Sequence, residues 1–325
     1  MRIFRLPVLL GLLLMSAAAA RAENWPTRPI RFVVAFDAGG TVDIVARVVG
    51  DRLSKDLGQP VVIENRPGAA GNIAGEYVSH ATADGYTFLV SGQPTHSVGP
   101  HLFKNLNYNP MRDVPPVAML AVSPNLLVVN AKLPVKSVAD LVKLAKEKPG
   151  TVTYSSAGIG TSGFLAGEML AHKADLKITH IPYRGGGAAV NGLLSGNVDF
   201  MFFTIPALLP HVKSGDLRAL AIAGKDRSPL VPDVPTIAEA GYPGFDVNAW
   251  YGLFAAHGTP QPIVDKISAA IGKILAEKDV QERFAKLGAE PHYLGPKALT
   301  DYINVESPSF EPLLKDISIN LPGKK

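Results

Sequence analysis

Residues 31–43 read Arg-Phe-Val-Val-Ala-Phe-Asp-Ala-Gly-Gly-Thr-Val-Asp, an apolar run that breaks at paired glycines and gives way to a helical pattern. The β-favouring run from Arg31 to Phe36 is long enough for a strand buried on both faces. Gly39 and Gly40 can take backbone angles closed to other residues, and Thr41 or Asp43 is suited to cap the helix that follows. The stretch therefore predicts a strand, a tight turn and a helix.

Such a turn directs several backbone N–H groups and the positive end of a helix at one point in space. That arrangement suits an anion. The alternative is a tight strand-to-helix connection without a ligand, because most glycine turns bind nothing. Both interpretations stay open for this stretch taken alone.

The first 22 residues have the pattern of a secretory signal peptide and do not belong to the fold. Arg2 and Arg5 lead into the apolar run Leu6–Met15, and small residues follow up to Ala22. The rival interpretation is a membrane anchor, but the apolar core is about half of the roughly 20 residues that span a bilayer. We therefore expect cleavage after Ala22 and an exported mature chain that begins at Glu23.

The composition argues against several classes of protein. Removal of the leader takes away Arg2, Arg5 and Arg21, which lowers the formal net charge from +4 to +1. No basic block remains, so we expect no nucleic-acid partner. The chain has no cysteine, so its fold depends on a buried core and not on disulfides. Length alone favours about two domains.

Two series of strands and helices follow the leader. In the first, strands at residues 61–64 and 87–90 end in a glycine-rich loop, 65–72, and a polar loop, 91–96. Residues 117–130 are long enough for a strand that crosses into a second unit, and residues 247–256 provide the return crossing. Between the crossings we expect strands at 152–155, 178–182, 198–202 and 217–223, and helices at 138–145, 164–172 and 188–194. The tail, helical at 262–276 and 280–287, is expected to pack back on the first unit.

This alternation predicts an α/β fold of two lobes joined by two interdomain crossings. Lobe 1 comprises residues 23–123 and 249–325, and lobe 2 comprises residues 124–248. In open α/β sheets, ligands bind at the carboxyl ends of the strands, where the glycine-rich loops collect. We therefore expect a ligand cleft between the lobes.

Lobe 2 contains a counterpart of the first turn. Residues 155–163 read Ser-Ser-Ala-Gly-Ile-Gly-Thr-Ser-Gly, and Gly158 to Gly163 match the dinucleotide fingerprint. The next strand, however, ends in Tyr183-Arg184 and not in the acidic residue that holds a ribose, so a nucleotide site is the weaker alternative. An anion or small polar ligand held by Thr161, Ser162 and the helix N-terminus needs fewer assumptions.

Two further loops open toward the same cleft. Gly185–Gly187 follow one predicted strand, and Thr204 follows the strand that ends near Phe203. Ordinary turn chemistry explains either loop alone. Four such loops after strand ends favour a ligand site.

Metal and nucleophile chemistry have weaker support. The eight histidines are scattered without a pair at metal-ligand spacing, so we expect no metal and no cofactor. The glycines around Ser162 lack the Gly-x-Ser-x-Gly spacing of a hydrolase. An alternative function is a secreted α/β hydrolase in which Ser162, His96 and Asp43 act together.

Segments spread along the mature sequence carry a resemblance to a known family. They are residues 25–30, 39–43, 57–62, 64–69, 84–87, 167–168, 180–183, 217–221 and 232–236, among them Trp-Pro-Thr-Arg-Pro-Ile, Glu-Asn-Arg-Pro-Gly-Ala and Pro-Asp-Val-Pro-Thr. Together they resemble the Bug family, the periplasmic solute-binding proteins of tripartite tricarboxylate transporters. The resemblance covers nearly all of the mature chain and is more specific than a single glycine motif.

The resemblance implies a type II-like Venus-flytrap fold, no catalysis, a small organic carboxylate as ligand, and integral membrane transporter subunits as partners. A sensor that presents its closed form to a signalling receptor is an alternative. In the family, one carboxylate lies between two strand-to-helix turns, which correspond to Phe36–Asp43 and Ser156–Ser162. The residues expected to bind ligand are Phe36, Ala38, Gly39, Gly40, Thr41, Asp43, Thr95, His96, Ser156, Gly158, Thr161, Ser162, Gly186, Gly187, Ala188, Phe203 and Thr204.

Two positions depart from the family pattern. Thr204 stands where an acidic residue is frequent, and the absence of that acid argues against an amino acid as ligand. Asp37 stands where an uncharged residue is common. It would oppose an anion if it faces the cleft, and it would be harmless if it caps its own turn. Neither the orientation of Asp37 nor the choice between an aliphatic and an aromatic acid follows from the sequence.

Overall fold

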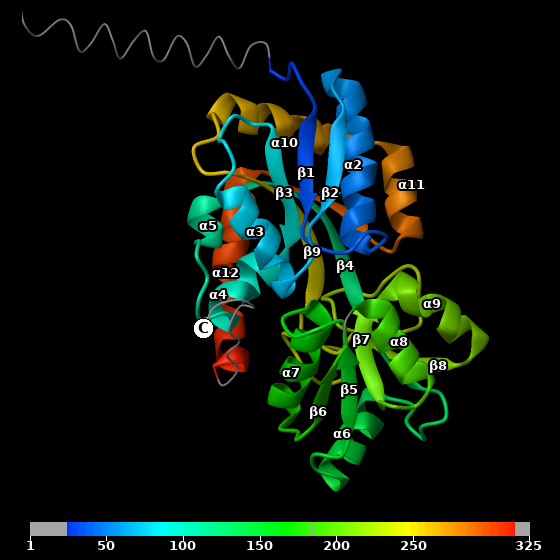
Figure 1. Cartoon of the computed structure of the whole chain (residues 1–325). Coiled ribbons are helices and arrows are strands. Elements are labelled where there is room, and N and C mark those ends of the chain that lie inside the picture. The colour runs from blue at the N-terminus through cyan, green and yellow to red at the C-terminus, as the bar shows by residue number, and fades with distance from the viewer. Residues whose placement is uncertain (1–24, 184, 316–325) are drawn as a thin grey trace, which may run out of the picture.

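A computed structural model describes residues 25–183 and 185–315; the predicted signal peptide and its cleavage after Ala22 lie outside these residues. Figure 1 shows two lobes, with β4 (Pro116–Asn130) and β9 (Asn248–Ala255) passing from one to the other. The α/β fold of two lobes with two crossings is therefore confirmed.

Lobe 1 is built on a mixed sheet. Its parallel part consists of β2 (Val61–Asn65), β1 (Ile30–Val34) and β3 (Thr87–Gly92), with β1 in the middle. β9 lies antiparallel between β3 and β4, and β10 (Glu290–Leu294) pairs antiparallel with β4. The parallel strands end together at one edge, where the turns that follow β1, β2 and β3 meet.

Lobe 2 continues from the second half of β4. That half pairs antiparallel with both β7 (Phe200–Thr204) and β8 (Leu217–Ile222). Beyond β7 lie β5 (Thr153–Ser156) and β6 (Thr179–Pro182) in parallel orientation. Because β4 belongs to both sheets, its apolar run of 15 residues is the physical connection that the sequence predicted.

The helices cover the faces of the two sheets. In lobe 1 they are α2 (Thr41–Leu57), α3 (Asn72–Ser79), α4 (Gly99–Leu102), α5 (Pro110–Asp113), α10 (Gln261–Leu275), α11 (Lys278–Lys286) and α12 (Pro296–Leu314). In lobe 2 they are α6 (Val138–Glu147), α7 (Ser162–Ala174), α8 (Gly186–Leu194) and α9 (Ile205–Ser214).

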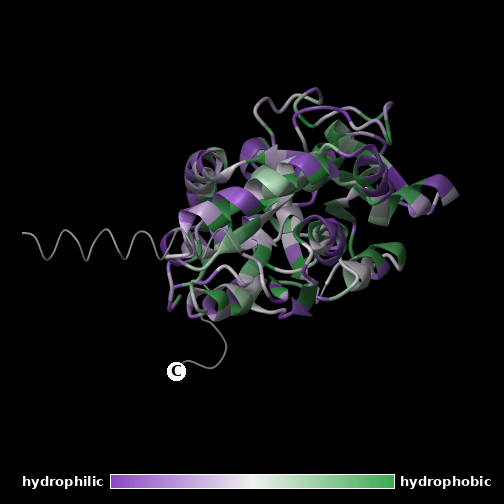
Figure 2. Cartoon of the chain, turned by 90° about the horizontal axis from the view of Figure 1, so that it is seen from above, coloured by the Kyte–Doolittle hydropathy of each residue, from purple (hydrophilic) through white to green (hydrophobic). Residues whose placement is uncertain are grey.

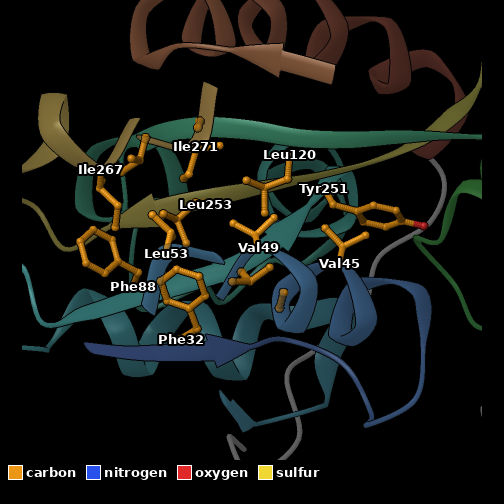
Figure 3. Close-up of a cluster of buried hydrophobic side chains, with 14 of the residues drawn as sticks. Phe32, Val45, Val49, Leu53, Phe88, Leu120, Tyr251, Leu253, Ile267 and Ile271 are labelled. Atoms are coloured by element: carbon orange, nitrogen blue, oxygen red, sulfur yellow. The ribbon is translucent and has the colours of Figure 1, made fainter. Parts of the chain in front are cut away.

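The core of lobe 1 shows why the tail of the chain returns to it. Val45, Val49 and Leu53 follow one another at helical spacing on α2 and are fully buried. Figure 3 shows them in one cluster with Ile267 and Ile271 of α10, which packs beside α2. Each such side chain stabilises the fold by about 1.5–3 kcal/mol. The prediction that the helical tail packs on the first unit is confirmed.

Among the elements that were not predicted from the sequence, α9, α12 and β10 have clear causes. α9 contains Pro210, and α12 contains Pro308 and Pro312, so proline signals obscured both helices. β10 is short and half exposed, and it becomes a strand because it pairs with β4.

The surface has the distribution expected of a folded domain. Figure 2 shows hydrophilic residues, in purple, along the outer helices and loops. Within the described part of the chain, no helix is both long enough and apolar enough to cross a membrane.

Candidate ligand site

A cavity of about 580 Å³ lies where the strand ends of the two lobes face each other. Lobe 1 contributes the turn after β1, the loop after β2 and the segment after β3; lobe 2 contributes the turns after β5, β6 and β7. The volume suits a small organic molecule. The wall consists of Phe36, Asp37, Gly40–Val42, Pro67–Gly71, Gly92–Pro94, Ala157–Ile159, Thr161, Ser162, Gly185, Gly186, Phe203, Thr204 and Ala249–Tyr251.

Helix starts are concentrated on this wall. Among the described residues, five α-helices (α2, α3, α7, α8 and α9) have their N-cap residue there: Gly40, Gly71, Thr161, Gly185 and Thr204. No side chain caps any of the five through a hydrogen bond. The first N–H groups of a helix have no acceptor within the helix, and they carry its positive partial charge. The cavity is therefore surrounded by donors suited to an anion.

The turn after β1 differs in detail from the prediction. Gly39 has φ +83°, a left-handed angle that favours glycine, whereas Gly40 has φ −74°, which any residue adopts. Gly40 is the N-cap of α2, and neither Thr41 nor Asp43 caps the helix. Thr41 lines the cavity together with Tyr251 of β9. The expectation that both glycines need special backbone angles is thus wrong for Gly40.

Asp43 supports the turn from behind. Its buried carboxylate accepts hydrogen bonds from Gly39 N at 2.9 Å, Arg47 Nε at 2.9 Å and Asn65 Nδ2 at 2.9 Å. Burial alone would raise the pKa of this carboxyl, but the hydrogen bonds from Arg47, Gly39 and Asn65 hold the pKa below its usual value. Asp43 is therefore ionised and fixes the turn, but it does not line the cavity.

The turn after β5 is held by its own hydroxyl groups. Ser156 Oγ is hydrogen-bonded to His180 Nε2 at 2.8 Å and accepts a hydrogen bond from Gly158 N at 3.1 Å. Thr161 Oγ1 donates to Gly158 O at 2.7 Å, and Ser162 Oγ donates to Asn125 Oδ1 at 3.3 Å. Thr161 and Ser162 line the cavity, whereas Ser156 is buried beneath it.

The same turn brings the two lobes into contact. Gly160 has φ +85°, and a Cβ at this position would lie 3.0 Å from Leu102 Cδ2 and 3.6 Å from Ala70 Cβ. Both neighbours belong to the lobe 1 part of the chain. Glycine at this position therefore permits the close approach of the two lobes.

Thr95 and His96 do not line the cavity. His96 is buried, stacks on Phe254 with ring centroids 3.6 Å apart, and is hydrogen-bonded through Nε2 to Val114 O at 3.1 Å. Burial lowers the pKa of His96 to about 4, so the ring is neutral. Thr95 Oγ1 donates to Ala70 O at 3.1 Å and so holds the loop after β2. These residues lie on a π-helical turn, η2 (Pro94–Val98), where the sequence predicted a loop.

The hydrolase alternative therefore has no geometry to support it. The hydroxyl of Ser162 is directed to Asn125, His96 is bonded to a backbone carbonyl, and Asp43 is bonded to Arg47. The described residues also contain no group of three side chains able to hold a metal ion.

The structure divides the expected binding residues into two sets. Those on the wall are Phe36, Gly40, Thr41, Gly158, Thr161, Ser162, Gly186, Phe203 and Thr204; those outside it are Ala38, Gly39, Asp43, Thr95, His96, Ser156, Gly187 and Ala188. The second set includes Thr95 and Ser156, which hold the wall residues Ala70 and Gly158 by hydrogen bonds. The expected binding residues did not include the wall residues Gln93 and Tyr251. The glycine-rich loop 65–72 did give a signal for Pro67–Gly71.

The cavity carries little formal charge. Asp37 is the only Asp, Glu, Lys, Arg or His among the wall residues that the structure describes. Its carbonyl oxygen accepts a hydrogen bond from Gly40 N at 3.4 Å. From the wall residues that the structure describes, a ligand anion would therefore meet backbone N–H groups and hydroxyls.

Comparison with known proteins gives consistent matches along the chain. Residues 45–319 match the model of the tripartite tricarboxylate transporter family receptor. A UPF0065 protein in the tcbD-tcbE intergenic region of Pseudomonas sp. (strain P51) is 37% identical, covering 96% of this chain and 93% of the relative. Protein BugT of Bordetella pertussis is 36% identical, covering 99% of this chain and 100% of BugT.

Solved structures agree with these relatives. R. palustris Rpa4515 with adipate has a TM-score of 0.84 at 35% identity, covering 91% of this chain and 100% of that one. The periplasmic binding protein BugD has a TM-score of 0.81 at 34% identity, covering 91% and 100%. MatC from Rhodopseudomonas palustris with bound malate has a TM-score of 0.80 at 37% identity, covering 89% and 100%.

These matches confirm the resemblance to the Bug family. They also exclude the enzyme alternative at the level of the family, since the similar proteins are periplasmic solute-binding proteins. The chain belongs to the tripartite tricarboxylate transporter receptor family of periplasmic solute-binding proteins.

Proposed function

We propose that this protein closes on a small organic carboxylate in the periplasm and delivers it to the integral membrane subunits of a tripartite tricarboxylate-type transporter. The observation that carries the proposal is the convergence of five helix N-termini without side-chain caps on one cavity. An unpaired helix start favours an anion by about 0.3–1 kcal/mol when exposed and up to about 2 kcal/mol when partly buried. The N–H groups there also supply directed hydrogen bonds.

The apolar part of the wall accounts for the rest of such a ligand. Phe36, Phe203 and Ile159 line the cavity together with the small side chains of the loop after β2. These groups are suited to the hydrocarbon part of a ligand, because its transfer from water to an apolar site is favourable. The arrangement therefore fits a molecule with a carboxylate and an aliphatic or aromatic body. Similar proteins were solved with adipate and with malate.

Delivery requires that closure depends on the ligand. We place lobe 1 at residues 23–123 and 249–325 and lobe 2 at residues 124–248, so that β4 and β9 are the hinge strands. Gly40 and Thr41 belong to one lobe and Thr161 and Ser162 to the other. A carboxylate that contacts both turns bridges the lobes and favours the closed form. The membrane subunits would recognise that closed form.

Export is the other part of the proposal. The mature chain would begin at Glu23 after cleavage behind Ala22. N-terminal sequencing of the periplasmic protein should find Glu23. Retention of Met1 on membrane-bound protein would contradict it.

The binding proposal is tested by thermal unfolding of the mature chain with paired ligands. Mono-, di- and aromatic carboxylates are compared with their neutral amides, for example adipate with adipamide. We expect at least one carboxylate to raise Tm with increasing concentration, its amide to have little effect, and the carboxylate to be recovered unchanged. Equal stabilisation by amide and acid would contradict anion recognition, and chemical turnover would contradict a binding function.

A further inference from the structure

α12 lies against both lobes. In its first half, Leu299 and Ile303 are buried in the lobe 1 core that contains Trp250. In its last turns, Phe310 and Leu314 join a hydrophobic cluster made mostly of lobe 2 residues, together with Val98, Leu102 and Phe103 of lobe 1, and the helix contacts α7 of lobe 2. Figure 1 shows α12, in orange to red, extending down beside lobe 1 toward α7. The helix therefore connects the lobes in addition to β4 and β9.

Glu306 lies between these two halves of α12. Its carboxylate accepts hydrogen bonds from Gln93 Nε2 at 2.9 Å, Ser97 Oγ at 2.5 Å and Trp250 Nε1 at 2.8 Å. Tyr302 OH, one turn earlier on the helix, donates at 3.4 Å. The adjacent Ser307 Oγ donates to Ser97 O at 2.8 Å. Two separate segments of lobe 1, the one after β3 and β9, are thus joined to α12 at one point.

This carboxylate is held by neutral donors. None of its hydrogen-bond partners in the described part of the chain is a cation. A partly buried carboxylate without a cation is costly to maintain, so stability alone gives no reason for it. Gln93 and Trp250, two of its partners, are fully buried residues that also line the ligand cavity.

We propose that α12 is a third interlobe connection, which favours closure of the lobes. Glu306 is the positioning residue that couples α12 to the cavity wall. The inference rests on the proposed carboxylate-binding function, but its conformational part concerns the ligand-free protein. Through Gln93 and Trp250, the carboxylate sets the position of the segment after β3 and of β9. Both segments form the lobe 1 wall against which lobe 2 closes.

Two substitutions separate this role from simple packing. Glu306→Ala leaves the Gln93, Ser97 and Trp250 donors without their acceptor. Glu306→Gln is the rescue variant, because Gln93 Oε1 has no hydrogen-bond partner among the described residues. If the side-chain amide of Gln93 flips, its Oε1 can accept a hydrogen bond from the amide nitrogen introduced at position 306. The amide oxygen at position 306 still faces Ser97 and Trp250. Glu311→Ala, at an exposed glutamate of the same helix, is the matched surface control.

Lobe separation is measured first, without ligand. The sequence has no cysteine, so Lys55→Cys on α2 and Lys213→Cys on α9 give two defined sites for spin labels. We expect Glu306→Ala to shift the distance distribution between the labels to larger values. Glu306→Gln and Glu311→Ala should keep the wild-type distribution. An unchanged distribution in Glu306→Ala would overturn the proposal, whatever ligand the protein takes.

Affinity for adipate and malate is measured second, with Ile267→Val as a control that weakens the core of lobe 1 away from the cavity. We expect Glu306→Ala to lose about tenfold or more in affinity. Glu306→Gln should lose less than about threefold. Loss of affinity in Ile267→Val equal to that in Glu306→Ala would contradict a positioning role. If the wild-type chain binds no carboxylate, the proposed function fails, and the label distances alone decide the role of α12.

Discussion

The substitution Gly40→Val tests whether a ligand anion approaches the N-terminus of α2. Gly40 lines the cavity and has φ −74° and ψ 166°, an extended conformation that valine adopts without strain. The nearest atom to a Cβ placed there is Asp37 O at 3.4 Å, an ordinary contact. The new side chain therefore fits the fold and extends into the space where the anion would lie.

The expected loss of affinity follows from the hydrogen bonds that the side chain blocks. Each bond from an N–H group to a charged acceptor contributes roughly 1.5–3 kcal/mol, or about 10- to 150-fold in affinity. Two such bonds at the start of α2 give an expected loss of about 100-fold or more. Stability should change little, because replacing an N-cap glycine by an apolar residue costs about 1 kcal/mol or less.

Calorimetry with the best carboxylate from the thermal screen measures the affinity, and urea unfolding measures the stability. Gly39→Ala is the matched control. Its Cβ would meet no atom within 4 Å, but φ +83° strains any side chain, so it should lower stability and affinity together. Undiminished affinity in Gly40→Val would refute the reasoning, because the ligand would not then be held at this turn.

Three further substitutions follow from contacts in and around the site. Asp43→Ala removes the acceptor of Gly39 N, so it should lower the free energy of unfolding by about 1–3 kcal/mol in urea denaturation. It should also lower ligand affinity. Full affinity in this variant would show that the turn does not need the Asp43 carboxylate. Asp37→Asn removes the negative charge from the described wall and should tighten adipate binding about two- to fivefold in low salt, measured by calorimetry. Unchanged affinity would show that the Asp37 side chain lies away from the ligand. Burial raises the pKa of Glu306, so its contribution to stability is largest below its ordinary pKa of about 4.5 and is lost as pH rises through the higher folded value. Between pH 4.5 and neutrality, the free energy of unfolding should therefore fall more in the wild-type protein than in Glu306→Gln. The same pH dependence in both proteins would contradict this prediction.

The fold could be predicted because its strands are unusually apolar. The run of residues 116–130 is buried almost throughout, and such a run between two alternating series identified the crossing. α12 could not be predicted in the same way. Pro308 and Pro312 signal a helix end, and only packing of Leu299 and Phe310 against separate cores keeps the segment helical.

The site could be predicted as turns but not as individual contacts. Position after a strand identified the segments around Gly40, Ser162 and Gly186, because parallel strands end at one edge. His96 follows a strand in the same way, yet stacking on Phe254 turns it into the core. Tyr251 lies within a crossing strand, where no local pattern marks a residue as part of a cavity.

The most direct test of the central claim is a crystal structure of the mature chain with the carboxylate that most raises its Tm. The account predicts a carboxylate group between the starts of α2 and α7. Its oxygens should lie about 2.7–3.1 Å from N–H groups of the first turns, near Thr41 and Ser162. A ligand whose carboxylate faces solvent, or lies away from both helix starts, would contradict the account.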